Sequence, residues 1–330
     1  MQPILRVALR GTGSYLPSET LDNEFFSRYL DTSDEWIHTR TGVRQRRRVG
    51  EGETTSTMAA RASERALENG GLNKNDIDLI ILATATPDQP IPATACAVQA
   101  ELGLDGVPAF DIGAACSGFM YGTVVGAHLL QGGLYRTVLV IGAETLTRFT
   151  DYQDRTTCVL FGDAAGAAIL QPEPNSDRGL VYASLGADGS RLQDIWAPAG
   201  GVRLPASAAT CAERLHYIRM RGREVYKFGV AKMMELIDEA LAATGFSADD
   251  LKLVIPHQSN LRIIESVREK LGLPSEKIAV NIDRYGNTSA ASIIVALDEA
   301  RRSGRVRPGD LIMMLGLGAG LTWGVGIWRI

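Results

Sequence analysis

The sequence contains few cysteines and few histidines, four of each in 330 residues. No two cysteines form a Cys-x-x-Cys pair, and none stands in a cluster with histidine. A structural zinc site and a disulfide framework are therefore not expected, and thiols that stay reduced fit a cytoplasmic protein. The cysteines are Cys96, Cys116, Cys158 and Cys211.

Long apolar runs and an excess of positive charge are also missing. Segments such as TVLVIGA and LIMMLGLGAG fall far short of the about 20 apolar residues that cross a bilayer. The opening, MQPILRVALRGTGSYLP, breaks at Gly11 and has no small-residue cleavage site, so a signal peptide is not expected. The formal net charge is −4, which argues against nucleic acid as a general partner. These absences predict a cytoplasmic protein that binds neither membranes nor nucleic acid.

An internal repeat is the strongest pattern that the sequence does contain. AARASERALENGGLNKNDIDLIILATAT and VAKMMELIDEALAATGFSADDLKLVIPHQSN share one plan: an amphipathic helix, a turn, acidic residues and a β-rich apolar run. Asp76 and Asp250 match in this alignment, and Val138 and Leu311 match further on at nearly the same separation. A constant offset favours an internal duplication over two unrelated domains.

The repeat predicts an α/β fold made of two pseudo-duplicated halves, residues 1–175 and residues 176–330. Short apolar runs such as LIILAT and VLVIG are typical of strands buried on both faces. The run SGFMYGTVVGAHLLQ, residues 117–131, is apolar almost all round, which is typical of a buried helix. We therefore expect a layered architecture in which helices lie between sheets.

Three polar side chains stand at comparable strand-to-loop junctions of the two halves. Cys116 follows PAFDIG in the first half, whereas His257 follows LKLVIP and Asn287 follows IAVNID in the second. Sites in α/β sheets gather beyond the carboxyl ends of the strands. If a pseudo-twofold axis relates the halves, these loops converge on one point.

Cys116, in FDIGAACSG, is predicted to be a nucleophile. A lone cysteine is more often a buried structural thiol, but the preceding glycine and alanines and the following helix favour a reactive one. Free N–H groups at a helix N-terminus are expected to lower the pKa of the thiol from about 8.5. The other three cysteines lack this context and are interpreted as structural or incidental.

His257 and Asn287 each have a plainer alternative. A histidine after an apolar strand can be a satisfied core residue, and an asparagine after Gly286 can be a turn residue. The polar run after His257 and the matching position in the repeat favour a role, and an amide that cannot titrate suits an oxygen that becomes negative. LGLGAGLTWG, residues 315–324, has no P-loop spacing and is expected to bring a backbone N–H close to a reacting carbonyl.

At these residues the sequence resembles β-ketoacyl-acyl-carrier-protein synthase III, a family of condensing enzymes in the thiolase superfamily. The resemblance covers essentially the whole chain and implies a thiolase-like fold with α-β-α-β-α layers. It also implies a catalytic triad of Cys116, His257 and Asn287, and an oxyanion hole formed by the backbone N–H groups of Cys116 and Ala319. The motifs that carry it are GTGSYLP, DTSDEWIHTRTG, FDIGAACSG, DRTTCVLFGDAAGAA, PHQSNLRII, RYGNTSAAS and GLTWG.

The resemblance implies a decarboxylating Claisen condensation that starts fatty-acid synthesis. An acyl-CoA would acylate Cys116, and malonyl-acyl-carrier protein would then lose CO₂ to give an enolate held by His257 and Asn287. The enolate would attack the acyl-cysteine and give 3-ketoacyl-acyl-carrier protein. Neither a metal nor another cofactor is needed.

The resemblance also assigns substrate contacts. Trp36 and Arg40 would sandwich the adenine of CoA, and further CoA contacts would come from Thr32, Arg155 and Asn260. The acidic carrier protein would dock on Lys227, Gln258, Arg262 and Lys270, of which Arg262 is the strongest candidate. A homodimer is implied as well, in which the partner inserts the residue at position 91 into the acyl pocket.

Three positions depart from residues that are frequent in the family. Ile91 stands where phenylalanine is often found, and Leu317 and Ala319 stand where aromatic residues and glycine are frequent. Ile91 and Leu317 are assigned to the acyl pocket, and the smaller Ile91 predicts a primer larger than acetyl.

Two alternatives remain open. The same fold and triad could serve a specialised pathway, polyketide or quinolone-like, as an acyltransferase or as a condensing enzyme with another acceptor. A non-catalytic binding subunit of this fold would lack a triad member, and none is missing. Release of CO₂ from malonyl-carrier protein separates condensation from simple acyl transfer.

Overall fold

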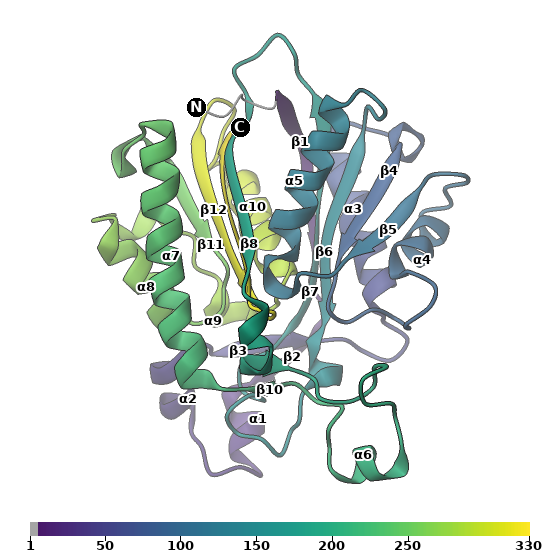
Figure 1. Ribbon diagram of the computed structural model, residues 1–330, viewed down its shortest axis with the longest axis vertical. Coiled ribbons are helices and arrows are strands. Elements are labelled where there is room, and N and C mark those ends of the chain that lie inside the picture. The colour runs from purple at the N-terminus through teal and green to yellow at the C-terminus, as the bar shows by residue number, and fades with distance from the viewer. Residues whose placement is uncertain (1–5) are drawn as a thin grey trace.

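The computed structural model describes residues 6–330, in which two larger sheets are each built by one part of the chain (Figure 1). The opening that bears on a signal peptide begins in residues 1–5, outside the described residues. The first sheet has the order β1-β7-β6-β4-β5. Its strands are β1 (Val7–Tyr15), β4 (Leu79–Ala83), β5 (Ala109–Ile112), β6 (Val138–Thr145) and β7 (Asp163–Pro172).

The second sheet has the order β11-β12-β13-β8 and repeats part of the first. In the first sheet β4 pairs with β6 in parallel, and β6 with β7 and β7 with β1 pair antiparallel. In the second sheet β11 pairs with β12 in parallel, and β12 with β13 and β13 with β8 pair antiparallel. A duplication would produce this shared order, and the boundary at residue 175 stays a proposal. The strands are β8 (Gly179–Ala187), β11 (Leu253–Pro256), β12 (Leu311–Gly318) and β13 (Thr322–Arg329).

Helices form three layers around these sheets, as predicted. The outer helices α3 and α4 pack on the first sheet, and α7 packs on the second with α8 beside it. Between the sheets lie α5 and α10, which contact strands of both. The bounds are α3 (Thr55–Gly70), α4 (Thr94–Glu101), α5 (Gly118–Gln131), α7 (Gly222–Thr244), α8 (Leu261–Lys270) and α10 (Ala291–Arg302).

Smaller elements surround the lower end of the molecule in Figure 1. Two short ribbons pair β2 with β3 and β9 with β10. Within residues 6–330, no helix is both long and apolar enough to cross a membrane. The bounds are β2 (Glu19–Asp22), β3 (Gln45–Arg48), β9 (Ile195–Trp196), β10 (Arg219–Met220), α1 (Asn23–Ser27), α2 (Asp34–Thr41), α6 (Ala208–Ala212) and α9 (Ile282–Tyr285).

Helix α5 is central because small residues let it approach both sheets closely. A Cβ atom at Gly122 would come within 2.9 Å of the Val140 side chain in the first sheet, so glycine is required there. On the other side Met120 packs against Gly324 and Gly326 of β13. The helix is less buried than its sequence predicts, since His128 is exposed on its remaining face.

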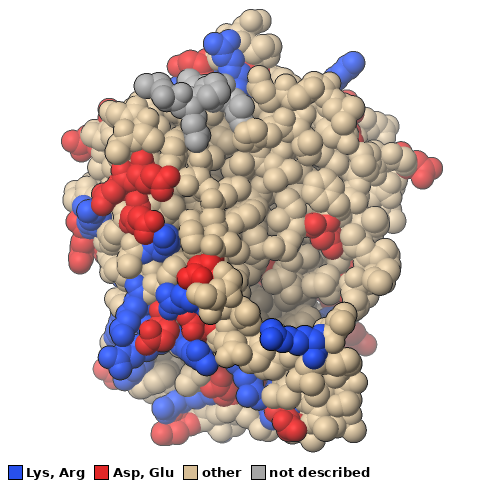
Figure 2. Space-filling model, viewed as in Figure 1, with Lys and Arg blue, Asp and Glu red and all other residues tan. Residues whose placement is uncertain are grey.

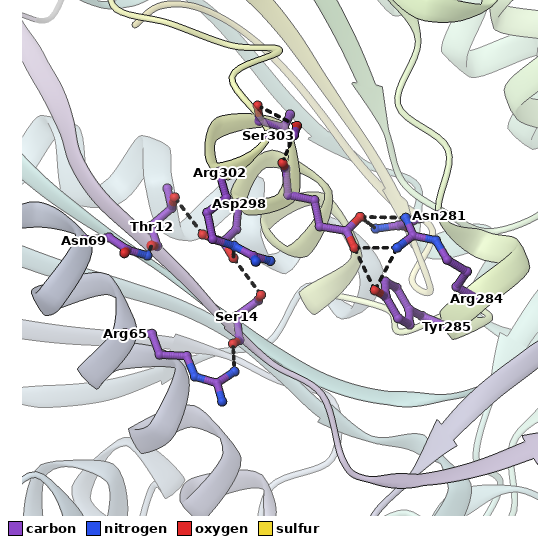
Figure 3. A network of polar contacts seen from close by, with 12 residues as sticks. Thr12, Ser14, Arg65, Asn69, Asn281, Arg284, Tyr285, Asp298, Arg302 and Ser303 are labelled. Carbon is purple, nitrogen blue, oxygen red and sulfur yellow. Dashed lines mark hydrogen bonds and ion pairs between the residues drawn. The ribbon is translucent and has the colours of Figure 1, made fainter.

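A buried polar network joins the first sheet to α10 (Figure 3). Asp298 is 1% exposed and accepts hydrogen bonds from Thr12 Oγ1 at 3.0 Å and Ser14 Oγ at 2.7 Å, both on β1. Arg302 Nε donates to the same carboxylate at 3.0 Å. The network therefore holds a helix of the second half against an outer strand of the first.

Candidate active site

One cavity of about 110 Å³ brings together Cys116, His257 and Asn287, as the sequence predicts. Cys116 and His257 come from the loops after β5 and β11, as predicted. Asn287 follows α9, so the strand expected before it in IAVNID is wrong. The rest of the wall is mostly apolar, so a charge that develops inside is poorly solvated and depends on fixed donors. The apolar lining includes Leu160, Phe161, Ile195, Met220, Val225, Phe228, Ile263, Leu317 and Leu321.

Cys116 lies in a tight turn rather than in the first turn of an α-helix. A 3₁₀ turn spans Ala115–Ser117 and leads into α5. Ala115 has φ +45°, a left-handed conformation that a residue with a Cβ rarely adopts. Such strain persists only where the surroundings enforce it, and it clusters at functional sites. The turn projects the thiol into the cavity.

The end of β12 approaches this turn very closely. A Cβ atom at Gly318 would lie 2.9 Å from the Cys116 backbone nitrogen, so glycine is required there. No loop or turn hydrogen bond within residues 6–330 uses the N–H of Cys116 or of Ala319. Both groups are therefore available to a substrate oxygen, and their role as an oxyanion hole stays a proposal.

The expected lowering of the Cys116 pKa is wrong for the free protein. Burial raises the pKa of the thiol to about 12, and the negative charge of Glu144 acts in the same direction. The thiol faces an apolar cavity without a cation, so the thiolate would lose its hydration without gaining a counter-charge. Cys116 is a protonated thiol before substrate arrives.

His257 is a neutral imidazole with one ring nitrogen free. The side chain is 1% exposed, and burial lowers its pKa to about 3. Its Nδ1 lies 2.6 Å from Ser292 Oγ, whose oxygen also accepts weakly from the Gln258 N–H at 3.4 Å. The serine hydroxyl can donate to Nδ1, and we infer the tautomer with the imidazole proton on Nε2 from this contact. His257 thus has an N–H donor left for the cavity.

Hydrogen bonds also hold the backbone and the side chain of Asn287 in one orientation. Its backbone N–H donates to the Leu160 carbonyl at 2.8 Å, and its carbonyl accepts from Gly162 at 3.0 Å. Its side-chain Oδ1 accepts from the Ser289 N–H at 2.9 Å. The amide Nδ2 is therefore the group left for the cavity, and two neutral donors meet there.

The buried histidine predicts a specific loss of stability in acid. Unfolding raises the pKa of His257 from about 3 to about 6.5, so the unfolded chain binds one more proton below pH 6.5. Relative to His257→Gln, the free energy of unfolding should fall by about 2 kcal/mol between pH 7 and pH 5. Guanidinium unfolding curves of both proteins at the two pH values measure this. A pH-independent difference would contradict the neutral assignment.

At the predicted CoA site, two arginine side chains lie over the ring of Trp36. The guanidinium carbons of Arg40 and Arg155 each lie 4.8 Å from the centre of the Trp36 ring. Both guanidinium groups lie against the indole, where a purine would stack, and the expected sandwich of Trp36 and Arg40 around the adenine stays a proposal. Thr32 Oγ1 is buried without a hydrogen-bond partner among the described residues, and its contact with the nucleotide stays a proposal.

Asn260 is occupied differently from the prediction. It caps α8, accepting from the Arg262 N–H at 2.9 Å, and its Nδ2 donates to the Arg40 carbonyl at 3.0 Å. It also lines the cavity. The side chain therefore ties α2 to α8 at the entrance, and a contact with the pantetheine arm stays a proposal.

Charged side chains gather at the lower left of the face in Figure 2, where Figure 1 places α2 and the lower ends of α7 and α8. Of the docking residues, Lys227 and Lys270 pair with Glu224 and Asp238 at 3.7 and 3.1 Å. Arg262 donates to the Thr39 carbonyl at 3.1 Å and is exposed. Their contact with a carrier protein stays a proposal.

The assignment of Gln258 to carrier docking is wrong. Its side chain is fully buried, and all of its hydrogen bonds are internal. Nε2 donates to the Pro256 and Ala279 carbonyls, and Oε1 accepts from the N–H groups of Asn281 and Ile282. The amide holds the His257 loop against the segment before Asn287.

The two residues predicted to form the acyl pocket, Ile91 and Leu317, lie in different parts of the structure. Leu317 lines the cavity, whereas Ile91 is 87% exposed and does not line this chain's own cavity. An exposed Ile91 is compatible with insertion into a partner chain.

Sequence reasoning missed three residues behind the cavity. Glu144 at the end of β6 is fully buried and accepts from Ser289, which in turn orients Asn287. Ser292 orients His257 through its side-chain hydroxyl. Both serines lie in RYGNTSAAS at the i and i+3 positions of one turn, and this spacing is the signal that could have identified them.

Comparisons with known proteins show which family the chain is similar to. Two family descriptions match: 3-oxoacyl-[acyl-carrier-protein] synthase III over residues 110–189, and the C-terminal part of the same synthase over residues 241–330. The beta-ketoacyl-[acyl-carrier-protein] synthase III of Symbiobacterium thermophilum is 50% identical over 318 residues, 96% of each chain. That of Caldanaerobacter subterraneus is 49% identical over 97% of this chain and 96% of its own.

Solved structures give the same result for the fold. The 3-oxoacyl-[acyl-carrier-protein] synthase III of Aquifex aeolicus superposes with a TM-score of 0.90 at 45% identity, over 98% of this chain and all of its own. A priming beta-ketosynthase of the R1128 polyketide pathway also has a TM-score of 0.90, at 35% identity, over 98% of this chain and 96% of its own.

Proposed function

The chain belongs to the beta-ketoacyl-[acyl-carrier-protein] synthase III family, and we propose that Cys116, His257 and Asn287 carry out this family's condensation. It is an acyltransferase that starts fatty-acid synthesis by condensing an acyl-CoA with malonyl-acyl-carrier protein. The observation that carries the residue assignment is the cavity in which one thiol meets two neutral, fixed donors.

In the first half-reaction Cys116 Sγ attacks the acyl-CoA thioester carbon. The carbonyl oxygen becomes negative, and the N–H groups of Cys116 and Ala319, which make no loop or turn hydrogen bond within residues 6–330, would donate to it. The bond to the CoA sulfur then breaks, and CoA leaves as a thiol with the proton that Cys116 gives up. The product is an acyl-cysteine, and charge is conserved.

The second half-reaction uses the two side-chain donors. Loss of CO₂ from the malonyl group moves an electron pair onto the thioester oxygen, and the His257 and Asn287 N–H groups stabilise that oxygen. A neutral imidazole suits this role, because it donates a hydrogen bond without first protonating the enolate carbon. The carbon then attacks the acyl-cysteine, and Cys116 leaves as a thiolate that takes up a proton.

Substrate contacts extend this proposal to the surface. Trp36 with Arg40 or Arg155 would hold the CoA adenine once one guanidinium moves off the indole, and Thr32 Oγ1 would meet the nucleotide. Exposed Lys227, Lys270 and Arg262 would attract an acidic carrier protein, mainly by raising the association rate.

Release of labelled CO₂ tests the proposed function directly. The protein is supplied with acyl-CoA and carboxyl-labelled malonyl-carrier protein, and we expect equal amounts of CO₂ and 3-ketoacyl product. A panel of acetyl-, isobutyryl- and octanoyl-CoA tests the primer at the same time. Acyl transfer without CO₂ would reject condensation, and a strong acetyl preference would reject the larger primer that Ile91 suggests.

A homodimer completes the proposal. Within residues 6–330, strand β5 ends the first sheet with one edge unpaired, and Ile91 projects from the surface at 87% exposure. An open strand edge and an exposed aliphatic side chain are favourable for contact with a second copy. Sedimentation equilibrium should give twice the chain mass of 35.5 kDa, and a monomer would contradict the proposal.

A further inference from the structure

Glu144 is a fully buried carboxyl group that the proposed reaction does not use. It stands at the end of β6 and is surrounded by neutral donors. Thr86 Oγ1 donates at 2.7 Å, the Ala85 N–H at 3.0 Å and Ser289 Oγ at 2.8 Å. A buried carboxylate is expensive unless it is well hydrogen-bonded, so this site was built around the group.

Ser289 connects this carboxylate to Asn287. Its Oγ donates to Glu144, while its backbone N–H donates to Asn287 Oδ1 at 2.9 Å. Its φ is +47°, a left-handed conformation for a residue that is not glycine. That conformation turns the N–H toward Asn287, and it must be enforced from outside. The hydrogen bond to Glu144 supplies the enforcement.

The packing around this turn leaves little freedom. Gly142, two residues before Glu144, lies so close to the Ala290 carbonyl that a Cβ there would be 2.3 Å from the oxygen. Gly118, two residues after Cys116, faces the Ala290 side chain. The turn is therefore held between β6 and the nucleophile's helix, and Glu144 provides its polar anchor.

We infer that Glu144 is a positioning residue for the decarboxylation step: through Ser289 it fixes the Asn287 amide with Nδ2 directed into the cavity. An amide can rotate by half a turn and present its oxygen instead, which would repel an enolate. The Ser289 N–H selects the productive orientation, and Glu144 holds that N–H in place. The inference rests on the proposed role of Asn287.

The two half-reactions separate this role from general structural support. Acylation of Cys116 uses backbone donors and does not involve the Asn287 amide. Because the Glu144 charge raises the pKa of the Cys116 thiol, Glu144→Gln should acylate at least as fast as the wild type. Decarboxylation depends on the amide and should slow. For Glu144→Gln and Ser289→Ala, we expect the kcat of CO₂ release to fall tenfold to a hundredfold, part of the about 10²–10³ that one lost donor removes. The KM for malonyl-carrier protein should change less than kcat.

A double-mutant cycle provides the decisive readout. If Glu144 acts through Asn287, Glu144→Gln should slow CO₂ release in the wild type but hardly at all in the Asn287→Ala background. A residue that only supports the fold would reduce the rate by the same factor in both backgrounds. That equal reduction would overturn the inference.

Matched control variants remove a buried polar group elsewhere in the protein, so they measure the general effect of such a loss. Asp298→Asn changes a buried carboxylate that also accepts two hydroxyl donors, but on the far part of α10 (Figure 3). Ser63→Ala removes a buried hydroxyl inside α3. Both controls should leave the ratio of the two half-reaction rates unchanged, whatever they do to the melting temperature.

The remaining outcomes are also decisive. If both half-reactions fall together in Glu144→Gln, or if CO₂ release is unchanged in Ser289→Ala, Glu144 does not position the amide. If Glu144→Gln fails to fold, Ser289→Ala alone provides the cycle with Asn287→Ala. If Asn287→Ala itself keeps full CO₂ release, the proposed function of Asn287 has failed, and this result is distinct from a failure of Glu144.

Discussion

Replacing Cys116 with alanine is expected to abolish acyl transfer and to reduce condensation by a factor of about 10⁴ or more. The variant lacks the sulfur that holds the acyl group between the two half-reactions, and no other thiol lines the cavity within residues 6–330. The smaller side chain fits the same turn, so the fold should survive. His257 and Asn287 remain, and slow loss of CO₂ from malonyl-carrier protein should persist without condensation.

Intact-protein mass spectrometry after incubation with acyl-CoA measures the acyl adduct. Wild-type protein should gain one acyl group, and Cys116→Ala should gain none. Cys96→Ala and Cys211→Ala are matched controls, because both thiols are exposed away from the cavity, and both should acylate normally. An adduct that survives in Cys116→Ala would reject the nucleophile assignment.

Loss of either side-chain donor should slow decarboxylation by about 10²–10³ while leaving acylation of Cys116 intact. In His257→Ala the enolate oxygen loses the Nε2 donor, and in Asn287→Ala it loses the Nδ2 donor. The two changes together should reduce the rate by less than the product of the single factors, because the donors act on one oxygen. Labelled CO₂ release gives the second step, and burst formation of the acyl-enzyme gives the first.

Matched controls exist for both donors. His128 is exposed on α5, and Asn69 Nδ2 donates to the Thr12 carbonyl on the far side of the first sheet. His128→Ala and Asn69→Ala should keep both half-reactions. A donor variant that loses acylation and decarboxylation equally would show that its residue supports the nucleophile, not the enolate.

The layers and the positions of two cavity side chains could be predicted from the sequence for one physical reason. Strands buried on both faces leave continuous apolar runs, and the repeat aligned the loops after them. Cys116 and His257 each follow a strand, β5 and β11. Asn287 follows α9 instead, and its selection rests on the family resemblance, which covers all three positions.

The residues that orient this triad could not be predicted in the same way. Glu144 and Ser289 are 145 positions apart, and their contact depends on how the two halves pack. Gln258 looked exposed because it is polar and follows a strand, yet four backbone groups surround its amide. The raised pKa of Cys116 likewise depends on the apolar wall, which is assembled from several distant segments.

The central position of α5 and the contact of Asp298 with β1 have a consequence for folding cooperativity. Helix α5 comes from the first half and contacts both sheets, and α10 comes from the second half and does the same. Neither half can bury its inner layer without the other. The duplicated chain therefore has one shared core rather than two separable ones, and it should melt in a single transition even though its sequence repeats.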